Sequence, residues 1–237
     1  RYEYPLLRRR DRGVWLGAAF EIKHAEHDWM GGGGYTDELR VARLALRGFL
    51  NDEGRATSIL LRSSIGLDVL GASGRSSFSR SRADADATFV SFNVYASHYR
   101  DPTRYTGVYA ALAAQWADRP LLVGEEFFVG GPVFGRAYDP GEIAGDRGIA
   151  GLIELRAGYD PELAAISLLQ AYAFADIAEV WNFSSGTDSV ASAGVGVRAN
   201  IQNWLTAGIE VARPLTRTPA SESDKDPRPF FSLTASY

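Results

Sequence analysis

The sequence predicts an all-β protein, an antiparallel transmembrane β-barrel with about eleven strands present in the chain. Three observations predict this class. Apolar and polar residues alternate with a period of two over segments of about ten residues, charged residues fall on one of the two resulting faces, and short connections alternate with long ones. Glycine accounts for 25 of the 237 residues. This is above the usual share of about 7% and favours strands and turns over helices.

The alternation is strictest near the beginning of the chain. Apolar residues stand at every even position from Val14 to Ile22, whereas Glu21 and Lys23 stand at odd positions. This is the pattern of a strand with two faces of opposite polarity. A truncated segment at 2–7 precedes it, and further segments with the same pattern follow at 40–50, 56–67, 90–97, 105–116, 149–157, 163–177, 191–201, 205–211 and 231–237.

The charged residues decide which face meets which environment. Ten of them lie on the polar faces of their segments: Glu21, Lys23, Arg43, Arg47, Arg62, Glu154, Arg156, Asp176, Arg198 and Glu210. Exceptions such as Arg55, Arg104 and Arg213 lie at strand ends. An Arg or Lys facing lipid near mid-membrane costs about 2–4 kcal/mol. The polar faces are therefore expected to enclose a lumen and the apolar faces to contact lipid. A soluble β-sandwich or jelly roll, which would bury the apolar faces between two sheets, is the alternative.

The connections alternate in length along the chain. Short turns are expected at 9–12, 51–54, 100–103, 159–162 and 202–203, and long loops at 27–36, 68–83, 118–145, 179–189 and 215–226. Transmembrane barrels have short periplasmic turns and longer extracellular loops. The most apolar stretch, 163–175, is too short to cross a bilayer as a helix and contains Ser167 and Gln170.

Composition argues against several other classes of function. A formal charge of −4 provides no positive field for nucleic acid, and the absence of cysteine removes thiolate metal sites and thiol catalysis. No Gly-x-Ser-x-Gly motif is present, and the sequence offers no convincing metal or cofactor site. We therefore expect a protein that is not an enzyme and binds no cofactor, metal or nucleic acid. The Arg- and Ser-rich segment 74–82 could contact lipopolysaccharide phosphates, or be a mobile exposed loop.

The most informative residues lie in and after the longest connection, 118–145. Glycine gives the tip of this loop backbone freedom, so that Arg136 can approach the wall closely. Period two places Glu154, Phe174 and Asp176 on the lumen face, where Arg136 could form a bidentate pair with Asp176 or Glu154. Alternatively, these carboxylates pair with Arg156 or Arg198 on adjacent strands.

In combination, these motifs resemble those of the haemolysin secretion/activation proteins, the two-partner-secretion transporters of Gram-negative bacteria. At the tip of the loop, Arg136 and Tyr138 match the family's Val-Arg-Gly-Tyr/Phe, whereas Gly135 and Ala137 stand at the Val and Gly positions. The other segments that carry the resemblance are Gly145-Asp146-Arg147-Gly148, Glu154-Leu155-Arg156, Phe174-Ala175-Asp176 and Tyr4-Pro5-Leu6-Leu7-Arg8.

The resemblance implies that residues 1–237 are the C-terminal part of a sixteen-strand barrel, strands six to sixteen. Periplasmic POTRA domains and the first strands would lie outside this chain. The extracellular loop 118–145 would fold into the lumen and be latched there through Arg136 to Asp176, with Phe174 and Glu154 as further wall partners. The loop motif would include Gly145, Asp146 and Gly148.

The function implied by the resemblance is export of a large unfolded haemolysin- or adhesin-like exoprotein across the Gram-negative outer membrane. Further expected partners are membrane lipid, lipopolysaccharide and the barrel-assembly machinery. The last would recognise a C-terminal signal formed by Phe231, Leu233 and Tyr237. The alternatives are a barrel-assembly or insertion factor of the same superfamily and a passive porin-like channel.

Overall fold

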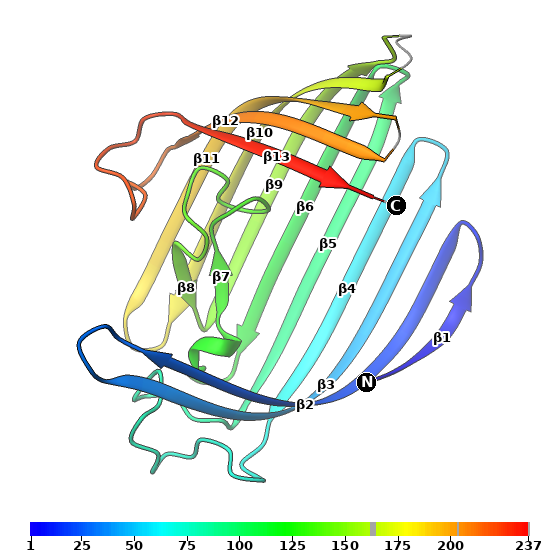
Figure 1. The fold of residues 1–237 in the computed structure, drawn as a ribbon. Coiled ribbons are helices and arrows are strands. Elements are labelled where there is room, and N and C mark those ends of the chain that lie inside the picture. The colour runs from blue at the N-terminus through cyan, green and yellow to red at the C-terminus, as the bar shows by residue number, and fades with distance from the viewer. Residues whose placement is uncertain (162–164, 203, 237) are drawn as a thin grey trace.

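The computed structural model describes residues 1–161, 165–202 and 204–236. Within these residues, eleven strands form one antiparallel sheet in which chain neighbours pair throughout, and the two strands on either side of the long loop, β6 and β9, also pair (Figure 1). The sheet strands are β1 (Tyr2–Arg8), β2 (Arg12–Asp28), β3 (Gly34–Asp52), β4 (Arg55–Gly66), β5 (Phe89–Thr103), β6 (Thr106–Ala117), β9 (Arg147–Tyr159), β10 (Ile166–Asn182), β11 (Gly186–Ile201), β12 (Leu205–Pro214) and β13 (Arg228–Ala235).

The sheet curls as the wall of a barrel does, but it remains open (Figure 1). No pairing joins the two edge strands, β1 and β13, in the described part of the chain. The predicted all-β class and antiparallel sheet of eleven strands are therefore confirmed, whereas a closed barrel is not formed by this chain. Among the described residues, no helix is long and apolar enough to span a membrane.

The two faces of the sheet differ as the alternation predicts. Large apolar side chains such as Ile177, Val195 and Phe231 are 64%, 59% and 78% exposed, whereas Glu154 and Asp176, at positions of the opposite parity, are buried. No second large sheet covers the apolar rows in the part of the chain that the structure describes. The soluble sandwich is therefore wrong, because the rows that it would bury are left uncovered.

Two of the expected long loops are tight turns instead. Pairing between β2 and β3 continues to Asp28 opposite Gly34, and pairing between β10 and β11 continues to Asn182 opposite Gly186. The expected turn at 100–103 is the end of β5, and the turns expected at 159–162 and 202–203 lie partly outside the described residues. Long connections remain between β4 and β5, β6 and β9, and β12 and β13.

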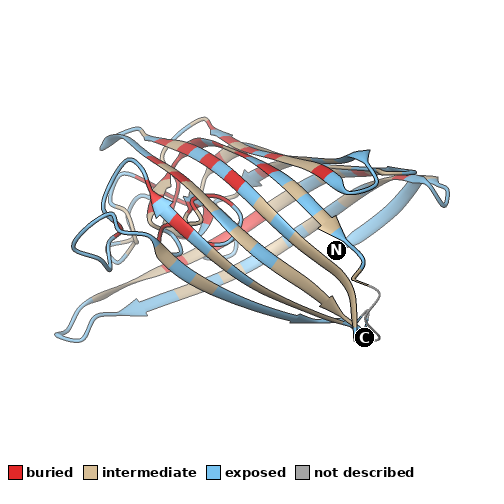
Figure 2. Cartoon of the chain, turned by 90° about the horizontal axis from the view of Figure 1, so that it is seen from above, coloured by how far each residue is buried: buried red, intermediate tan, exposed pale blue. Residues whose placement is uncertain are grey.

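The connection between β6 and β9 lies within the curve of the sheet (Figures 1 and 2). It contains a single 3-10 turn, η1 (Val123–Glu125), and a two-stranded sheet formed by β7 (Phe127–Val129) and β8 (Ile143–Gly145). Its apolar side chains pack against inward-facing side chains of the wall in one buried cluster that includes Val129, Tyr138, Leu152, Phe174 and Val180. The main hydrophobic core therefore joins the loop to the inner face of the sheet.

Candidate functional site: the lumenal loop and its wall contacts

The tip of the loop, residues 132–140, is held by the carboxylate of Asp176 on β10. The backbone N–H groups of Gly135 and Arg136 donate to the two oxygens of Asp176 at 3.0 and 3.2 Å, and the Ser192 hydroxyl donates to Oδ1 at 2.7 Å. Asp176 is buried beneath the tip. Gly135 has a φ of +74°, a backbone conformation that glycine adopts without steric cost. This glycine allows the tip to approach the wall closely, as the sequence suggested.

The guanidinium of Arg136 binds two other carboxylates. Its Nη1 lies 2.8 Å from Glu154 Oε2 on β9 and 3.1 Å from Glu210 Oε2 on β12, and its Cζ lies 4.5 Å from the centre of the Phe174 ring. The expected side-chain pair between Arg136 and Asp176 is therefore corrected: Arg136 reaches Asp176 through its backbone N–H. The expected alternative partner, Glu154, does bind its side chain.

Glu154 also binds the arginines that the alternative interpretation assigned to it. Its Oε1 accepts from Arg156 Nε at 2.7 Å and from Arg198 Nη2, while its Oε2 faces Arg136. One fully buried carboxylate therefore joins the loop to β9 and β11. Because buried charges need partners, this cluster favours the docked position of the tip.

Glu210 is a site residue that sequence reasoning missed. Besides Arg136, it accepts a hydrogen bond of 2.9 Å from the Tyr172 hydroxyl, and Arg198 stacks on the Tyr172 ring with its Cζ 4.1 Å from the ring centre. The alternation had already placed Glu210 on the lumen face. The alternation does not specify which side chains Glu210 contacts, so its pair with Arg136 at the tip could not be predicted.

Ala137 and Tyr138 complete the tip. Ala137 is fully buried and has an ordinary negative φ, so it does not need the glycine found in the family motif. The buried Tyr138 hydroxyl donates to the Ala191 carbonyl at 3.0 Å and lies 2.9 Å from Thr216 Oγ1. This residue thus joins the tip to β11 and to the β12–β13 connection.

The second loop motif, around Asp146, joins three connections at one buried carboxylate. Asp146 accepts from the backbone N–H of Leu121 at 2.7 Å and of Phe183 at 3.0 Å, and its Oδ1 lies 2.6 Å from Arg82 Nη1. The neighbouring glycines leave room for side chains, because a Cβ on Gly148 would lie 2.3 Å from the Phe127 ring and one on Gly145 would lie 2.8 Å from Val180.

Arg82 lies on the β4–β5 connection, which the sequence suggested to be an exposed loop, but its side chain is largely buried. Its side chain is 15% exposed and lies 2.6 Å from Glu126 Oε1 as well as from Asp146. Burial raises the pKa of Glu126, and the nearby Arg82 opposes this increase. Burial by itself would lower the pKa of Arg82, but its ion pairs, led by that with Asp146, raise it. This residue therefore anchors the loop rather than facing outside phosphates.

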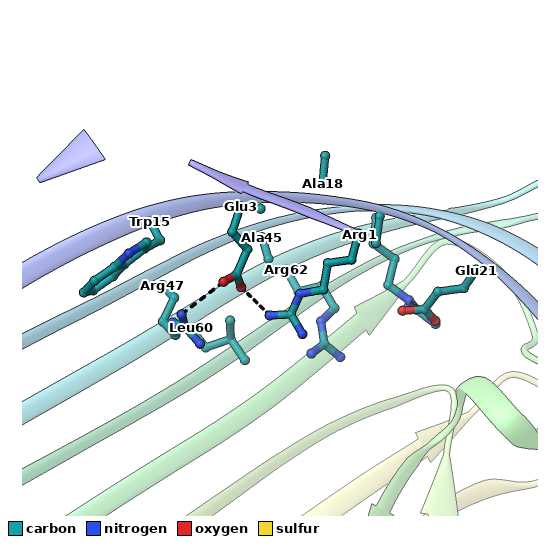
Figure 3. A pocket seen from close by; sticks show the side chains of 12 residues that line it. Arg1, Glu3, Trp15, Ala18, Glu21, Ala45, Arg47, Leu60 and Arg62 are labelled. Carbon is teal, nitrogen blue, oxygen red and sulfur yellow. Dashed lines mark hydrogen bonds and ion pairs between the residues drawn. The ribbon is translucent and has the colours of Figure 1, made fainter. Parts of the chain in front are cut away.

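The inner wall near the base of the loop carries further charges. Glu125 lies 2.7 Å from Lys23 Nζ on β2 and 2.7 Å from Arg43 Nη2 on β3, a contact that sequence reasoning also missed. Close by, Glu21, Arg47 and Arg62 help to line a cavity of about 290 Å³ on the wall formed by β1–β4 (Figure 3). A polar, water-accessible lumen wall is therefore present beside the loop.

The remaining predicted residues lie elsewhere. Phe231 and Leu233 are on the edge strand β13 and are 78% and 72% exposed, and Tyr237 lies outside the described residues. Within the described ranges, no group of three or more His, Asp or Glu side chains is arranged to hold a metal ion.

Comparisons with known proteins show the fold and the family of this chain. The solved structure of CdiB from Escherichia coli has a TM-score of 0.78 to this chain at 16% sequence identity, over 98% of this chain and 44% of that one. The chain thus corresponds to less than half of CdiB, and the likeness shows a common fold. A search of curated proteins finds no match. The sequence model of the family described as "Haemolysin secretion/activation protein ShlB/FhaC/HecB" matches residues 40–199, more than half of the chain. The chain therefore belongs to the ShlB/FhaC/HecB family of haemolysin secretion/activation proteins, which are two-partner-secretion transporters of the outer membrane.

Proposed function

We propose that this chain is the C-terminal part of the transmembrane barrel of an outer-membrane transporter, which exports a large unfolded exoprotein through its lumen. The family assignment supports transport across the outer membrane. A parent barrel of sixteen strands, with this chain as strands six to sixteen, agrees with the open edges of β1 and β13. An antiparallel sheet closes without a parallel pair only with an even number of strands.

The observation that carries the proposal is the docked tip of the loop. Asp176 binds two consecutive backbone N–H groups, and Arg136 lies between Glu154 and Glu210. The docked loop occupies the space through which an exported chain would pass, so it acts as a gate.

The contacts of the tip suit a gate that opens reversibly. Exposed ion pairs contribute about 0–1 kcal/mol, whereas removing one partner of a buried pair costs about 3–5 kcal/mol. In the pair between Arg136 and Glu210 the side chains are 12% and 15% exposed, so this pair lies between the two limits, whereas Glu154 is fully buried. Water entering the lumen can replace the lost contacts as the tip leaves. No covalent chemistry is required.

A passive porin-like channel is less consistent with this structure. The loop is fixed at its tip by Asp176 and at its base by Glu125 and Asp146. A barrel-assembly factor of the same superfamily remains the second candidate, although the family match favours secretion. The two candidates differ in whether loss of the transporter stops one exoprotein or the assembly of many barrels.

The test removes either partner of the tip in the whole protein. We expect Arg136→Ala and Asp176→Ala to leave the barrel folded in the membrane and to lower secretion of the exoprotein. Arg213→Ala is the matched control, because Arg213 is exposed at the end of β12 and, among the described residues, its side chain donates a hydrogen bond to the Lys225 carbonyl alone. Undiminished secretion by both variants would refute the gate.

The other proposed partners make contact at the outer surface. Membrane lipid and lipopolysaccharide would contact the exposed apolar rows and the adjacent loops. The barrel-assembly machinery would bind the edge strand β13 through the C-terminal signal formed by Phe231, Leu233 and Tyr237. Gram-negative outer-membrane localisation follows from the same proposal.

A further inference from the structure

We propose that Glu125 is a positioning residue: its carboxylate clamps the base of the lumenal loop to β2 and β3, so that only the tip beyond Gly130 moves when the gate opens. This inference rests on the proposed gating function. It adds a fixed part of the loop and assigns that part to a residue outside the motifs of the tip.

The clamp is a buried, multiply bonded ion pair. Arg43 Nη2 lies 2.7 and 2.9 Å from the two oxygens of Glu125, and Lys23 Nζ lies 2.7 Å from Oε1. The side chains of Glu125 and Arg43 are 5% and 10% exposed. One guanidinium nitrogen is thus shared by both carboxylate oxygens, and hydrogen bonds between two charged groups are stronger than those between neutral groups. Among the charged contacts of the loop, this one reaches β2 and β3, far along the sheet from the strands that hold the tip.

Arg43 is itself held in place by the wall. Its Nε donates to Glu21 Oε2 at 2.9 Å, and its Nη1 donates to Ser64 Oγ at 2.6 Å. Three adjacent strands, β2, β3 and β4, therefore orient the guanidinium before the loop binds. Such preorganisation lowers the side-chain entropy lost when the contact forms.

The rest of the base is equally well connected. Gln115 Nε2 on β6 donates to the backbone carbonyls of Glu125 and Asp146 at 3.0 and 3.2 Å, joining the two ends of the loop. Glu126 binds Arg82, and β7 pairs with β8. The base, residues 123–129 and 143–146, is thus tied to the wall independently of Asp176.

The boundary between base and tip is marked by glycines. Gly130 and Gly131 have φ angles of +122° and +100°, and Gly141, on the returning segment, has a φ of +73°. Glycine allows such angles and permits large backbone changes at little steric cost. These residues separate the base, held by Glu125 and Asp146, from the tip, held by Asp176.

The test compares labels on the two parts of the loop. Residues 1–237 contain no cysteine, so Phe128→Cys on the base and Val133→Cys on the tip each introduce a single thiol into this part of the protein, at a half-exposed position. A nitroxide spin label is attached to each variant of the whole protein in proteoliposomes. Electron paramagnetic resonance then measures the mobility of the label, and heat-modifiable migration on gels checks that the barrel is folded.

The expected pattern is specific for the clamp. Glu125→Gln and Arg43→Gln should each mobilise the label at 128 several-fold. Arg47→Gln, the matched control, changes an arginine on the same strand and face as Arg43 that pairs with Glu3 and should leave that label immobile. Asp176→Ala should mobilise the label at 133 but not the label at 128. Since Arg43→Gln leaves the loop sequence intact, it also tests the clamp if Glu125→Gln does not assemble.

Two results would overturn the inference. The first is an immobile label at 128 in folded Glu125→Gln and Arg43→Gln, which would show that the pair does not hold the base. The second is equal mobilisation of both labels by Asp176→Ala, which would show that the loop moves as one body. If Asp176→Ala mobilises neither label, the proposed gate fails at its tip, but the effect of Glu125→Gln on position 128 still decides the clamp.

Discussion

At the scale of single residues, the wall binds the tip through backbone N–H groups as well as through the side chain of Arg136. Asp176 accepts the N–H groups of Gly135 and Arg136, so the conformation of these two peptide units determines whether the carboxylate is satisfied. The left-handed conformation of Gly135 is therefore part of the recognition, whereas Ala137 has an ordinary backbone.

We predict that Gly135→Ala undocks the tip and that Ala137→Gly has less effect. A left-handed conformation costs an alanine about 1–2 kcal/mol. A Cβ at position 135 would also lie 3.3 Å from the Gly130 backbone. Ala137→Gly loses one buried methyl group, which is worth about 0.8 kcal/mol. Mobility of the spin label at position 133 measures both effects, and a greater effect of Ala137→Gly would contradict this reasoning.

The residues of the candidate site could be predicted more fully than their pairing. The alternation with period two placed Glu154, Asp176 and Glu210 on the lumen face, and the sequence motif of the loop identified Arg136. Three carboxylates within reach of one tip cannot be ranked by sequence spacing, because the choice depends on how the loop folds. The contacts of Glu125 could not be predicted for the same reason, since its partners Lys23 and Arg43 lie 102 and 82 residues earlier in the chain.

At the scale of elements, the strands were predictable within the apolar zone and less so beyond it. Apolar alternation in the second segment ends near Ile22, but β2 continues through Lys23, His24 and Glu26 to Asp28. Outside the apolar rows, cross-strand hydrogen bonds sustain the ladder without burial, so alternation no longer reports the strand. The three-residue strands β7 and β8 are too short to show any period.

The β12–β13 connection, residues 215–227, covers the tip and should respond to acid. Asp139 accepts from Arg228 Nη2 at 2.8 Å and from the backbone N–H and hydroxyl of Ser221 at 2.8 and 2.9 Å. Hydrogen bonds from Arg228 and Ser221 lower the pKa of Asp139. A lowered pKa stabilises the docked connection above the ordinary Asp pKa of about 3.9, and this contribution is lost as the pH falls through the lowered value.

We therefore predict that hydrogen exchange in 215–227 is slow at neutral pH and that protection is lost at strongly acid pH. Exchange is compared after correction for its intrinsic pH dependence. Asp139→Asn should show the lower protection already at neutral pH. Asp224→Asn, which changes an exposed carboxylate in the same connection, is the control. Equal protection of Asp139→Asn and the parent protein at neutral pH would contradict the assignment.

At the scale of the whole molecule, the exposed apolar rows on the outer face determine whether the sheet is stable in lipid or in water. Val195 lies near the middle of β11, opposite Ala173 and Val211, and Tyr159 lies at the end of β9. If lipid covers this face, Val195→Arg should destabilise the folded barrel by about 2–4 kcal/mol, whereas an arginine near the interface costs about 0–1 kcal/mol. Denaturant titration in lipid vesicles measures both values, with Tyr159→Arg as the comparison. Similar small costs at the two positions would argue against a membrane-spanning sheet.

The charge balance around the docked tip has an electrical consequence for the molecule as a whole. The carboxylates of Glu154, Asp176 and Glu210 and the guanidinium groups of Arg136, Arg156 and Arg198 lie around the docked tip, and with all six groups ionised their charges sum to zero. Departure of Arg136 leaves this part of the wall with one uncompensated negative charge. Small permeating cations should then be enriched beside this charge. Under a salt gradient, the reversal potential should therefore move toward the equilibrium potential of the cation as the tip withdraws.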